Sequence, residues 1–304
     1  MTRYAAKYRR VARSLSRVAL MRTSMDATFT MSDFDVADRD TGRLFLDFYG
    51  DSGIELGLER YGIFEALHRR GWRDFKLDTH AHDDRHTLLL DGVGTDGSTE
   101  RLFELVVRRD QVRIEGVERS WESLTIDWLG LRNPQGAFTE ERLRLPGQDA
   151  PGLGMAERVL ELLYRVVARL QLDGLLTVAE HFHLAVLYAR EFTFVDPYFA
   201  GQLGALMELL LGREALSFPQ AAWAVHWGCV RTAEGVPFSW RGEAMVNARD
   251  TELAAWLGTA AHLERAGEIA GSLRFSLERA AFEERWAAES GDLLKALPTE
   301  EVRR

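Results

Sequence analysis

The chain has 304 residues, of which 46% are hydrophobic and 10% aromatic, so it can bury one extensive core or two smaller ones. No apolar stretch reaches the ~20 residues of a membrane span and no secretory signal pattern is present, so we expect a cytoplasmic protein without a transmembrane segment. The net charge is −9, and all acidic residues lie after residue 22. This acidic main part of the chain argues against nucleic acid as the main ligand. The single cysteine, Cys229, excludes an internal disulfide and a multi-cysteine zinc site.

Residues 1–30 are predicted to form a basic N-terminal arm, because residues 1–22 contain seven Lys/Arg and no acid. Apolar and aromatic side chains recur in this segment at helical spacing, at Tyr4, Tyr8, Val11, Leu15 and Val18. The pattern predicts a cationic amphipathic helix that binds an anionic surface or an acidic protein partner. The alternative is a disordered start of the chain.

The next hundred residues alternate between strand and helix patterns. Residues 43–50, RLFLDFYG, predict a strand, and residues 55–71 predict one amphipathic helix that stops at Gly71. Short β-rich segments separated by turn residues then predict an antiparallel meander, with strands at 72–79, 85–92, 100–109, 111–116 and 123–131.

Residues 142–178 change to a loop, a helix and a strand. The loop is rich in glycine and proline, and the apolar residues between Met155 and Leu170 keep a helical period. The run LDGLLTVA that follows predicts a buried strand.

The glycines of this loop suit the binding of a phosphate group. The start of a helix leaves backbone N–H groups unpaired and carries a partial positive charge, and glycine lets a pyrophosphate approach the backbone closely. The loop lacks the Gly-Lys-Ser/Thr ending of a nucleoside-triphosphate loop and the G-x-G-x-x-G spacing of a dinucleotide fold. A simple structural turn before a helix is the alternative interpretation.

The loop, the helix, the strand LDGLLTVA and the following HFHLAVLYAREFTF together resemble the GNAT superfamily of acetyl-CoA-dependent N-acyltransferases. That family has a pyrophosphate loop of the form Q/R-x-x-G-x-G/A and, after the next strand, a helix with an Asn-x-x-Ala-x-x-Leu-Tyr pattern. Leu187 and Tyr188 match the end of this pattern. The resemblance covers about residues 43–195 and implies an α+β fold with a mixed, mostly antiparallel sheet flanked by helices.

The resemblance also implies an acyl-CoA co-substrate, acetyl-CoA or another. Its pyrophosphate would be held by the loop residues Gly147, Gln148, Gly152, Leu153, Gly154 and Met155. An unidentified amine, on a small molecule or a protein, would attack the thioester directly, and no metal is needed for this transfer. A catalytically silent GNAT-like binding or scaffold protein is the first alternative.

The catalytic roles implied by the resemblance centre on the helix after the strand. Tyr188 would be the general acid that protonates the leaving thiolate. The candidates for the base that takes the proton of the amine are Glu180, His183 and Asp127.

Clustered histidines suggest a metal-dependent hydrolase as the second alternative. HAHDDRH places His80 and His82 two residues apart, and HFH does the same with His181 and His183. On a strand, this spacing presents two imidazoles on one face to a metal ion. HDDR is equally typical of the polar turn of a hairpin, which would break that alignment.

Residues 196–304 lie outside the resemblance and are predicted to form a mainly helical C-terminal extension. We expect this extension to cover the acceptor cleft, to form a homodimer surface or to bind a protein partner.

Overall fold

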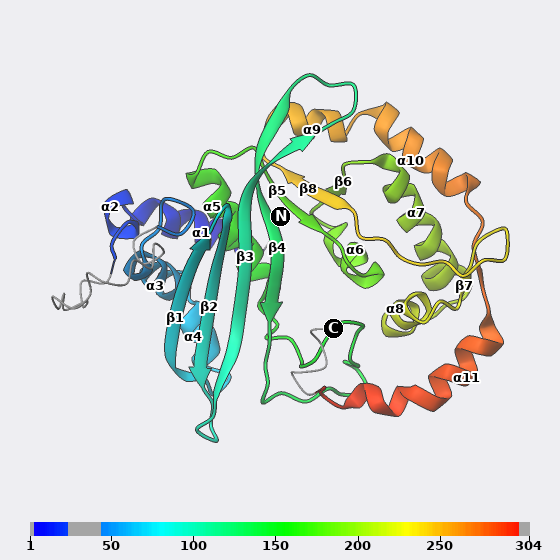
Figure 1. Ribbon diagram of the computed structural model, residues 1–304, viewed down its shortest axis with the longest axis horizontal. Helices are drawn as coiled ribbons and strands as arrows, with labels where there is room; N and C mark the ends of the chain where they lie inside the picture. The colour runs from blue at the N-terminus through cyan, green and yellow to red at the C-terminus, as the bar shows by residue number, and fades with distance from the viewer. Residues whose placement is uncertain (1–2, 24–43, 298–304) are drawn as a thin grey trace. The chain divides into compact units, whose positions relative to one another are not determined.

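The computed structural model describes residues 3–23 and 44–297, and its chain divides into two compact units. Unit 1 consists of residues 1–111, 122–134 and 152–172, and unit 2 of residues 112–121, 135–151 and 173–304. The fold is mixed α+β, with a mostly antiparallel open sheet flanked by helices (Figure 1). Among the described residues, no helix is long and apolar enough to cross a membrane.

Unit 1 contains four long strands in the order in which they follow each other along the chain. They are β1 (Arg73–His82), β2 (Arg85–Val93), β3 (Thr99–Arg113) and β4 (Ser120–Leu131). The first hairpin pairs His82 with Arg85 across a two-residue turn, in which Asp83 has a positive φ of 53°. The sequence HDDR is therefore a hairpin turn, one of the two predicted interpretations.

Strand β3 is longer than the sequence pattern predicts. The sequence RRDQ, residues 108–111, predicts a turn between two strands, but β3 runs through it without interruption. The reason lies at its far end, where Val112 and Ile114 are buried in the core of unit 2. Burial of these apolar side chains offsets the poor strand preference of Asp110.

The helices of unit 1 are short, apart from one. They are α1 (Ala5–Ser14), α2 (Arg17–Leu20), α3 (Asp51–Arg60), α4 (Ile63–His68) and α5 (Ala156–Arg169). The segment 55–71, predicted as one helix, breaks between α3 and α4 because Gly62 has a left-handed φ of 75°. The predicted strand at 43–50 is a tight turn closed by a bridge between Phe45 and Tyr49.

The basic N-terminal segment forms the expected amphipathic helix, and this helix contributes to the core of unit 1. In α1, Tyr8 is completely buried, and Leu15 and Leu20 beyond it are also buried. On α5, the guanidinium of Arg169 donates hydrogen bonds to the carbonyl oxygens of Ala12 and Leu15, at 2.8 and 3.2 Å. The described part of the segment is therefore packed against the body of unit 1.

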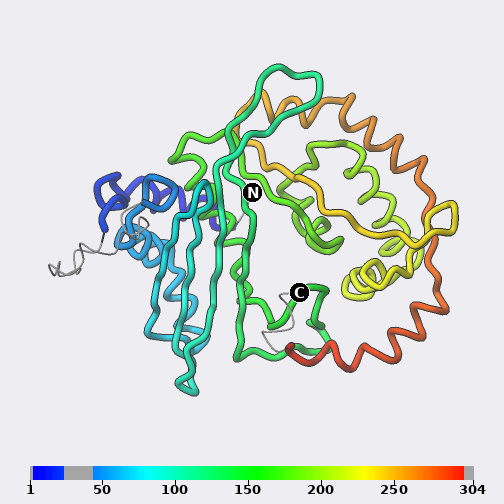
Figure 2. Tube along the Cα trace, in the orientation of Figure 1, coloured from blue at the N-terminus to red at the C-terminus, as the bar shows by residue number. Residues whose placement is uncertain are grey.

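Unit 2 contains three further strands that pair out of chain order. They are β5 (Gly174–Val178), β6 (Thr193–Phe194) and β8 (Ala244–Ala248), and β8 lies between the other two and is antiparallel to both. A two-stranded sheet is formed by β7 (Val230–Arg231) and β9 (Ser276–Leu277). Figure 2 traces the long connection from β7 to β8. The central strand of this group thus comes from the predicted helical extension.

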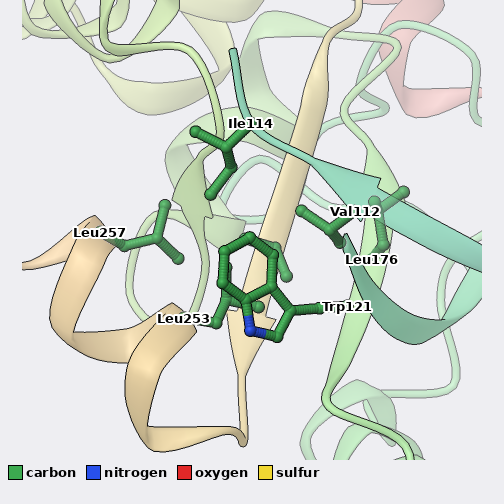
Figure 3. Packing of buried hydrophobic residues seen from close by; sticks show 7 residues of the cluster. Val112, Ile114, Trp121, Leu176, Leu253 and Leu257 are labelled. Carbon is green, nitrogen blue, oxygen red and sulfur yellow. The ribbon is translucent and has the colours of Figure 1, made fainter. Parts of the chain in front are cut away.

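The core of unit 2 gathers around Trp121, at the base of the turn between β3 and β4 (Figure 3). Trp121 is 1% exposed, and its indole nitrogen donates to the carboxylate of Asp250 at 3.1 Å. The aliphatic side chains around it are those of Val112, Ile114, Leu176, Val246, Leu253 and Leu257.

The helices of unit 2 include α6 (Phe182–Tyr188), α7 (Pro197–Met207), α8 (Phe218–His226), α9 (Thr251–Leu257), α10 (Ala260–Ser272) and α11 (Arg279–Glu289). A π-helical turn, Glu208–Arg213, continues α7, and a 3₁₀ turn, Ser290–Leu294, follows α11. Gly201 on α7 allows close packing, since a Cβ atom there would lie 2.6 Å from the carbonyl oxygen of Ala266 on α10. The described residues of 196–297 are mainly helical, apart from β7, β8 and β9.

Candidate functional site

The predicted loop crosses from unit 2 into unit 1 after Pro151, and each part is held within its own unit. In unit 2, residues 145–148 form a turn in which the amide of Gln148 donates to the carbonyl of Leu145 at 3.1 Å. The side-chain oxygen of Gln148 accepts the amide of Leu145 in return, at 3.0 Å. Gly147 has a φ of 77°, a conformation that favours glycine. Gln148 therefore stabilises its own turn.

Gly147 lies directly against a histidine. A Cβ atom at Gly147 would be 2.5 Å from Nε2 of His181, so any larger residue there would displace the imidazole ring. The close approach places the turn beside the start of α6, where His181 is the residue that precedes the first helical position.

Three histidines gather at this point of unit 2. The rings of His181 and His183 are stacked, with centroids 5.3 Å apart, and the ring of His226 on α8 lies 6.2 Å from that of His181. Phe218 packs edge-on against His183, and Trp223 packs edge-on against His226. The sequence indicated the first two histidines as a pair, whereas His226 is distant in sequence and no local pattern pointed to it.

Burial keeps these imidazoles neutral. His183 is 2% exposed, and its burial, with smaller effects of His181 and His226, lowers its pKa to about 3. Burial also lowers the pKa values of His181 and His226. Nδ1 of His183 is buried and has no hydrogen-bond partner among the described residues. At neutral pH His183 is therefore an uncharged and weakly basic group.

Tyr188 is the last residue of α6 and lies mostly within the protein. Its ring packs against that of Phe192 at 5.8 Å, and its carbonyl oxygen accepts the amide of Phe192 at 2.8 Å. Burial raises the pKa of the phenol. The hydroxyl is therefore protonated at neutral pH and is a weaker acid than a solvent-exposed tyrosine.

Glu180 is exposed and lies between the end of β5 and the start of α6. The nearby Ala179 accepts a hydrogen bond from the indole nitrogen of Trp240 at 2.8 Å, which fixes the backbone at this point. Gly242 is close by, since a Cβ atom there would lie 3.2 Å from a carboxylate oxygen of Glu180. Glu180 is thus a solvent-facing carboxylate on a well-held backbone.

The second part of the predicted loop, residues 152–155, belongs to unit 1 and lies beside the end of β4. Gly152 forms a β-bridge with Arg132, and the amide of Leu153 donates to the carbonyl of Leu131 at 3.3 Å. Leu153 and Met155 are buried, so their side chains anchor the start of α5.

Gly154 is the exposed residue of this stretch and has a φ of 62°. A cation lies close to it, because a Cβ atom at Gly154 would be 3.6 Å from a guanidinium nitrogen of Arg70. Arg70 is held in place by a hydrogen bond of 2.7 Å to the carbonyl of Ala66. In the first turn of α5, the carboxylate of Glu157 binds Arg3. Two cations, Arg70 and Arg3, and one carboxylate, that of Glu157, therefore lie near this helix start.

The third candidate base, Asp127, lies on β4 in unit 1, where it is bound by two cations. Its carboxylate is 3.1 Å from Arg108 and 3.5 Å from Arg85. The carboxylate of Asp127 is therefore already engaged in two ion pairs.

The histidines of HAHDDRH have separate roles in unit 1. His80 and His82 are exposed and lie 3.5 and 3.2 Å from the carboxylates of Asp78 and Asp83, respectively. His86 is buried, and its Nδ1 accepts the amide of Leu46 at 3.0 Å. Within residues 3–23 and 44–297, no three His, Cys, Asp or Glu side chains are arranged so that they could hold a metal ion.

In comparisons with known proteins, no family model matches this chain and no curated protein matches its sequence.

Proposed function

We propose that the protein is an acyl-CoA-dependent acyltransferase that transfers an acyl group to an amine. The observation that carries the proposal is the position of Tyr188. It ends the helix after the strand that follows the loop and α5. The chain order of antiparallel strands, loop, helix, strand and helix, as in the resemblance, supports the same proposal.

Within unit 1 taken by itself, we assign a phosphate-binding site to the backbone of residues 152–155 and the start of α5. A helix of this length carries a partial positive charge at its N-terminus, and Gly154 leaves the backbone open on an exposed surface. The guanidinium of Arg70 beside Gly154 adds a full positive charge. The turn at residues 145–148 is a weaker candidate, because Gly147 is covered by His181.

In the proposed reaction, the nitrogen of the amine attacks the thioester carbonyl carbon and the carbon–sulfur bond breaks. Tyr188 gives its phenolic proton to the departing sulfur, since a neutral thiol is a far better leaving group than a thiolate. The proton released from the amine goes to a base, and solvent then returns the tyrosine to its neutral form.

Glu180 suits the role of this base better than His183 does. His183 is buried with a pKa of about 3, so it binds a proton only weakly. Glu180 is exposed, and an incoming amine can reach its carboxylate from solvent. We assign His183 to the packing of α6 against α8, next to Phe218.

The decisive experiment is a calorimetric titration of the protein with coenzyme A and with acetyl-CoA. Two variants at Gly152 provide a matched pair, because a Cβ atom there lies no closer than 3.6 Å to its nearest neighbour, the carbonyl oxygen of Leu131. Gly152→Ala is expected to fold and to bind the co-substrate. Gly152→Asp is expected to fold and to lose binding at least tenfold, because its carboxylate repels the pyrophosphate.

Absence of heat and of a shift in melting temperature with millimolar acetyl-CoA would overturn the proposal. Binding without thiol release against a broad panel of amines would instead identify a catalytically silent acyl-CoA-binding protein. Equal binding of acetyl-CoA by Gly152→Ala and Gly152→Asp would show that the pyrophosphate does not bind at residues 152–155.

A further inference from the structure

Unit 1 contains a partly open apolar cavity between its strands and its helices. The cavity offers about 90 Å³ of space to the centre of a water-sized sphere. One water molecule needs about 10–15 Å³ on this measure, so the space holds several groups of that size.

The walls of the cavity are almost entirely hydrocarbon. Strands β2 and β3 contribute Leu88, Leu105 and Val107, and the helices contribute Leu58, Val159 and Leu163. An apolar cavity does not hold water well, because water there has too few hydrogen-bond partners. An aliphatic or aromatic group is thus the occupant that its chemistry favours.

Two glycines that lie one turn apart on α3 have different surroundings, and only one of them borders open space in the cavity. At Gly53 a Cβ atom would lie 1.9 Å from the carbonyl oxygen of Leu20, so glycine is needed for the close approach of α2. At Gly57, which also lines the cavity, a Cβ atom would have nothing within 4 Å. A larger side chain at Gly57 would therefore occupy the cavity without a steric clash, and glycine keeps it open.

The cavity wall has a polar part on α5, and this part is positively charged. Among the described residues of the wall, Arg165 and Arg169 are the only Lys, Arg, Asp or Glu side chains. Arg165 forms a 2.8 Å ion pair with the buried Glu161, and Arg169 is bound to two backbone carbonyls. Nε of Arg165 is buried and has no acceptor among the described residues. A ligand that brings an acceptor oxygen would satisfy this donor.

We propose that unit 1 binds an aliphatic carboxylate, with its chain in the apolar cavity beside Gly57 and its carboxylate at Arg165. Chain burial supplies the affinity, because each buried methylene group is removed from water. The guanidinium supplies the preference for an anionic end, because a cationic end would meet two arginines. This site is independent of the acyl-CoA proposal, since it uses none of residues 152–155.

The test compares octanoate, octan-1-ol and octylammonium, which share one chain and differ in their end group. Affinity is measured by calorimetry, and stability is measured by the melting temperature, which rises when a ligand binds the folded state alone. Octanoate is expected to bind and to raise the melting temperature, octan-1-ol to bind more weakly, and octylammonium not to bind. Butyrate has the same carboxylate on a much shorter chain, and it is expected neither to bind measurably nor to change the melting temperature.

Gly57→Leu is the variant that tests the cavity. It is expected to melt at or above the temperature of the wild-type protein and to bind octanoate at least tenfold more weakly, because the leucine takes the place of the chain. Gly267→Leu on α10 is its matched control, since Gly267 is also helical, has nothing within 4 Å of its Cβ position and lies outside the cavity. If Gly57→Leu does not fold, Gly57→Ala is used as the test variant. It is expected to lose less of the affinity for octanoate, because alanine fills less of the cavity.

The end-group assignment needs a variant that leaves no buried charge unpaired. The double variant Glu161→Gln/Arg165→Met removes both partners of the ion pair, and octanoate is expected to bind it no better than octan-1-ol. The control is Glu65→Gln/Arg69→Met, which removes an exposed pair of the same spacing on α4.

Two outcomes would overturn the proposal. The first is no heat and no melting shift of the wild-type protein with millimolar octanoate. The second is equal octanoate binding by the wild-type protein and Gly57→Leu. Coenzyme A binding is measured in the same samples and is expected to be unchanged by Gly57→Leu, so failure of one proposal is distinguishable from failure of the other.

Discussion

The hydroxyl group of Tyr8 on α1 donates a hydrogen bond of 2.9 Å to the carbonyl oxygen of Tyr61, which directly follows α3. The two rings also pack against each other, with centroids 4.7 Å apart, and burial raises the pKa of Tyr8 to about 12. Tyr61 ends α3 and precedes the left-handed Gly62, so Tyr8 holds the break between α3 and α4. The N-terminal helix is thus an integral part of unit 1.

The first prediction concerns this contact. Tyr8→Ala is expected to lower the free energy of unfolding by about 3–5 kcal/mol, the scale for loss of a large buried aromatic ring. Tyr8→Phe removes only the hydroxyl and is expected to cost about 1 kcal/mol. Urea denaturation measures both. Arg10→Ala on the exposed face of the same helix is the control and is expected to have little effect.

The second prediction contrasts two tryptophans of β4. Trp121 is 1% exposed in the core of unit 2, whereas Trp128 is 52% exposed. We expect Trp121→Ala to lower the free energy of unfolding by about 3–5 kcal/mol and Trp128→Ala to change it by less than about 1 kcal/mol. Thermal unfolding followed by circular dichroism tests the difference. Similar effects of the two variants would contradict the packing around Trp121.

The third prediction is a pH dependence that arises from His183. Its pKa is about 3 in the folded protein and about 6.5 in the unfolded chain. Between these values the unfolded state binds more protons, so the stability associated with neutral His183 is present above about pH 6.5 and is lost as the pH falls toward 3. A full proton difference gives a slope of about 1.4 kcal/mol per pH unit.

The measurement is the free energy of unfolding at a series of pH values from 7 to 4. Carboxylates also titrate near the lower end, so the wild-type protein is compared with His183→Gln, which lacks the imidazole. The variant is expected to lose less stability than the wild-type protein between pH 6.5 and 4. His80→Gln, at an exposed position, is the control. Parallel curves for the wild-type protein and His183→Gln would show that His183 does not resist protonation.

The fourth prediction separates catalysis by Tyr188 from its packing. Tyr188→Phe keeps the contact with Phe192 and removes the ionisable hydroxyl, so acyl-CoA affinity is expected to hold while turnover falls on the order of ~10²-fold. A thiol-release assay measures turnover, and the melting curve of each protein checks its fold. Tyr198→Phe, at a tyrosine that is 42% exposed, is the control. Unchanged turnover in Tyr188→Phe would exclude the hydroxyl as the general acid.

The sequence by itself predicts the local elements whose pattern repeats over many residues. The helix after the loop was expected between Met155 and Leu170, and α5 spans Ala156–Arg169. The strand that follows, the helix up to Tyr188 and the hairpin turn at Asp83 also lie where their residues indicate. These features depend on hydrophobic periodicity and turn chemistry, which neighbouring residues carry.

Parts of the candidate site follow from the sequence in the same way. Tyr188, Glu180 and His183 are close together in the chain, so a local pattern can single them out. The loop residues 147–155 are also close together in the chain. The surroundings of each of them, however, depend on segments that are distant in the sequence. Only the fold places His181 over Gly147 and Arg70 beside Gly154.

The tertiary structure alone decides which distant segments pack together. It inserts β8 between β5 and β6, adds His226 to His181 and His183, and packs Tyr8 against Tyr61. It also continues β3 through a segment that reads as a turn, because Val112 and Ile114 are buried at its far end. Such pairings depend on the free energy gained when surfaces far apart in the chain exclude water together, and no single segment of sequence contains that information.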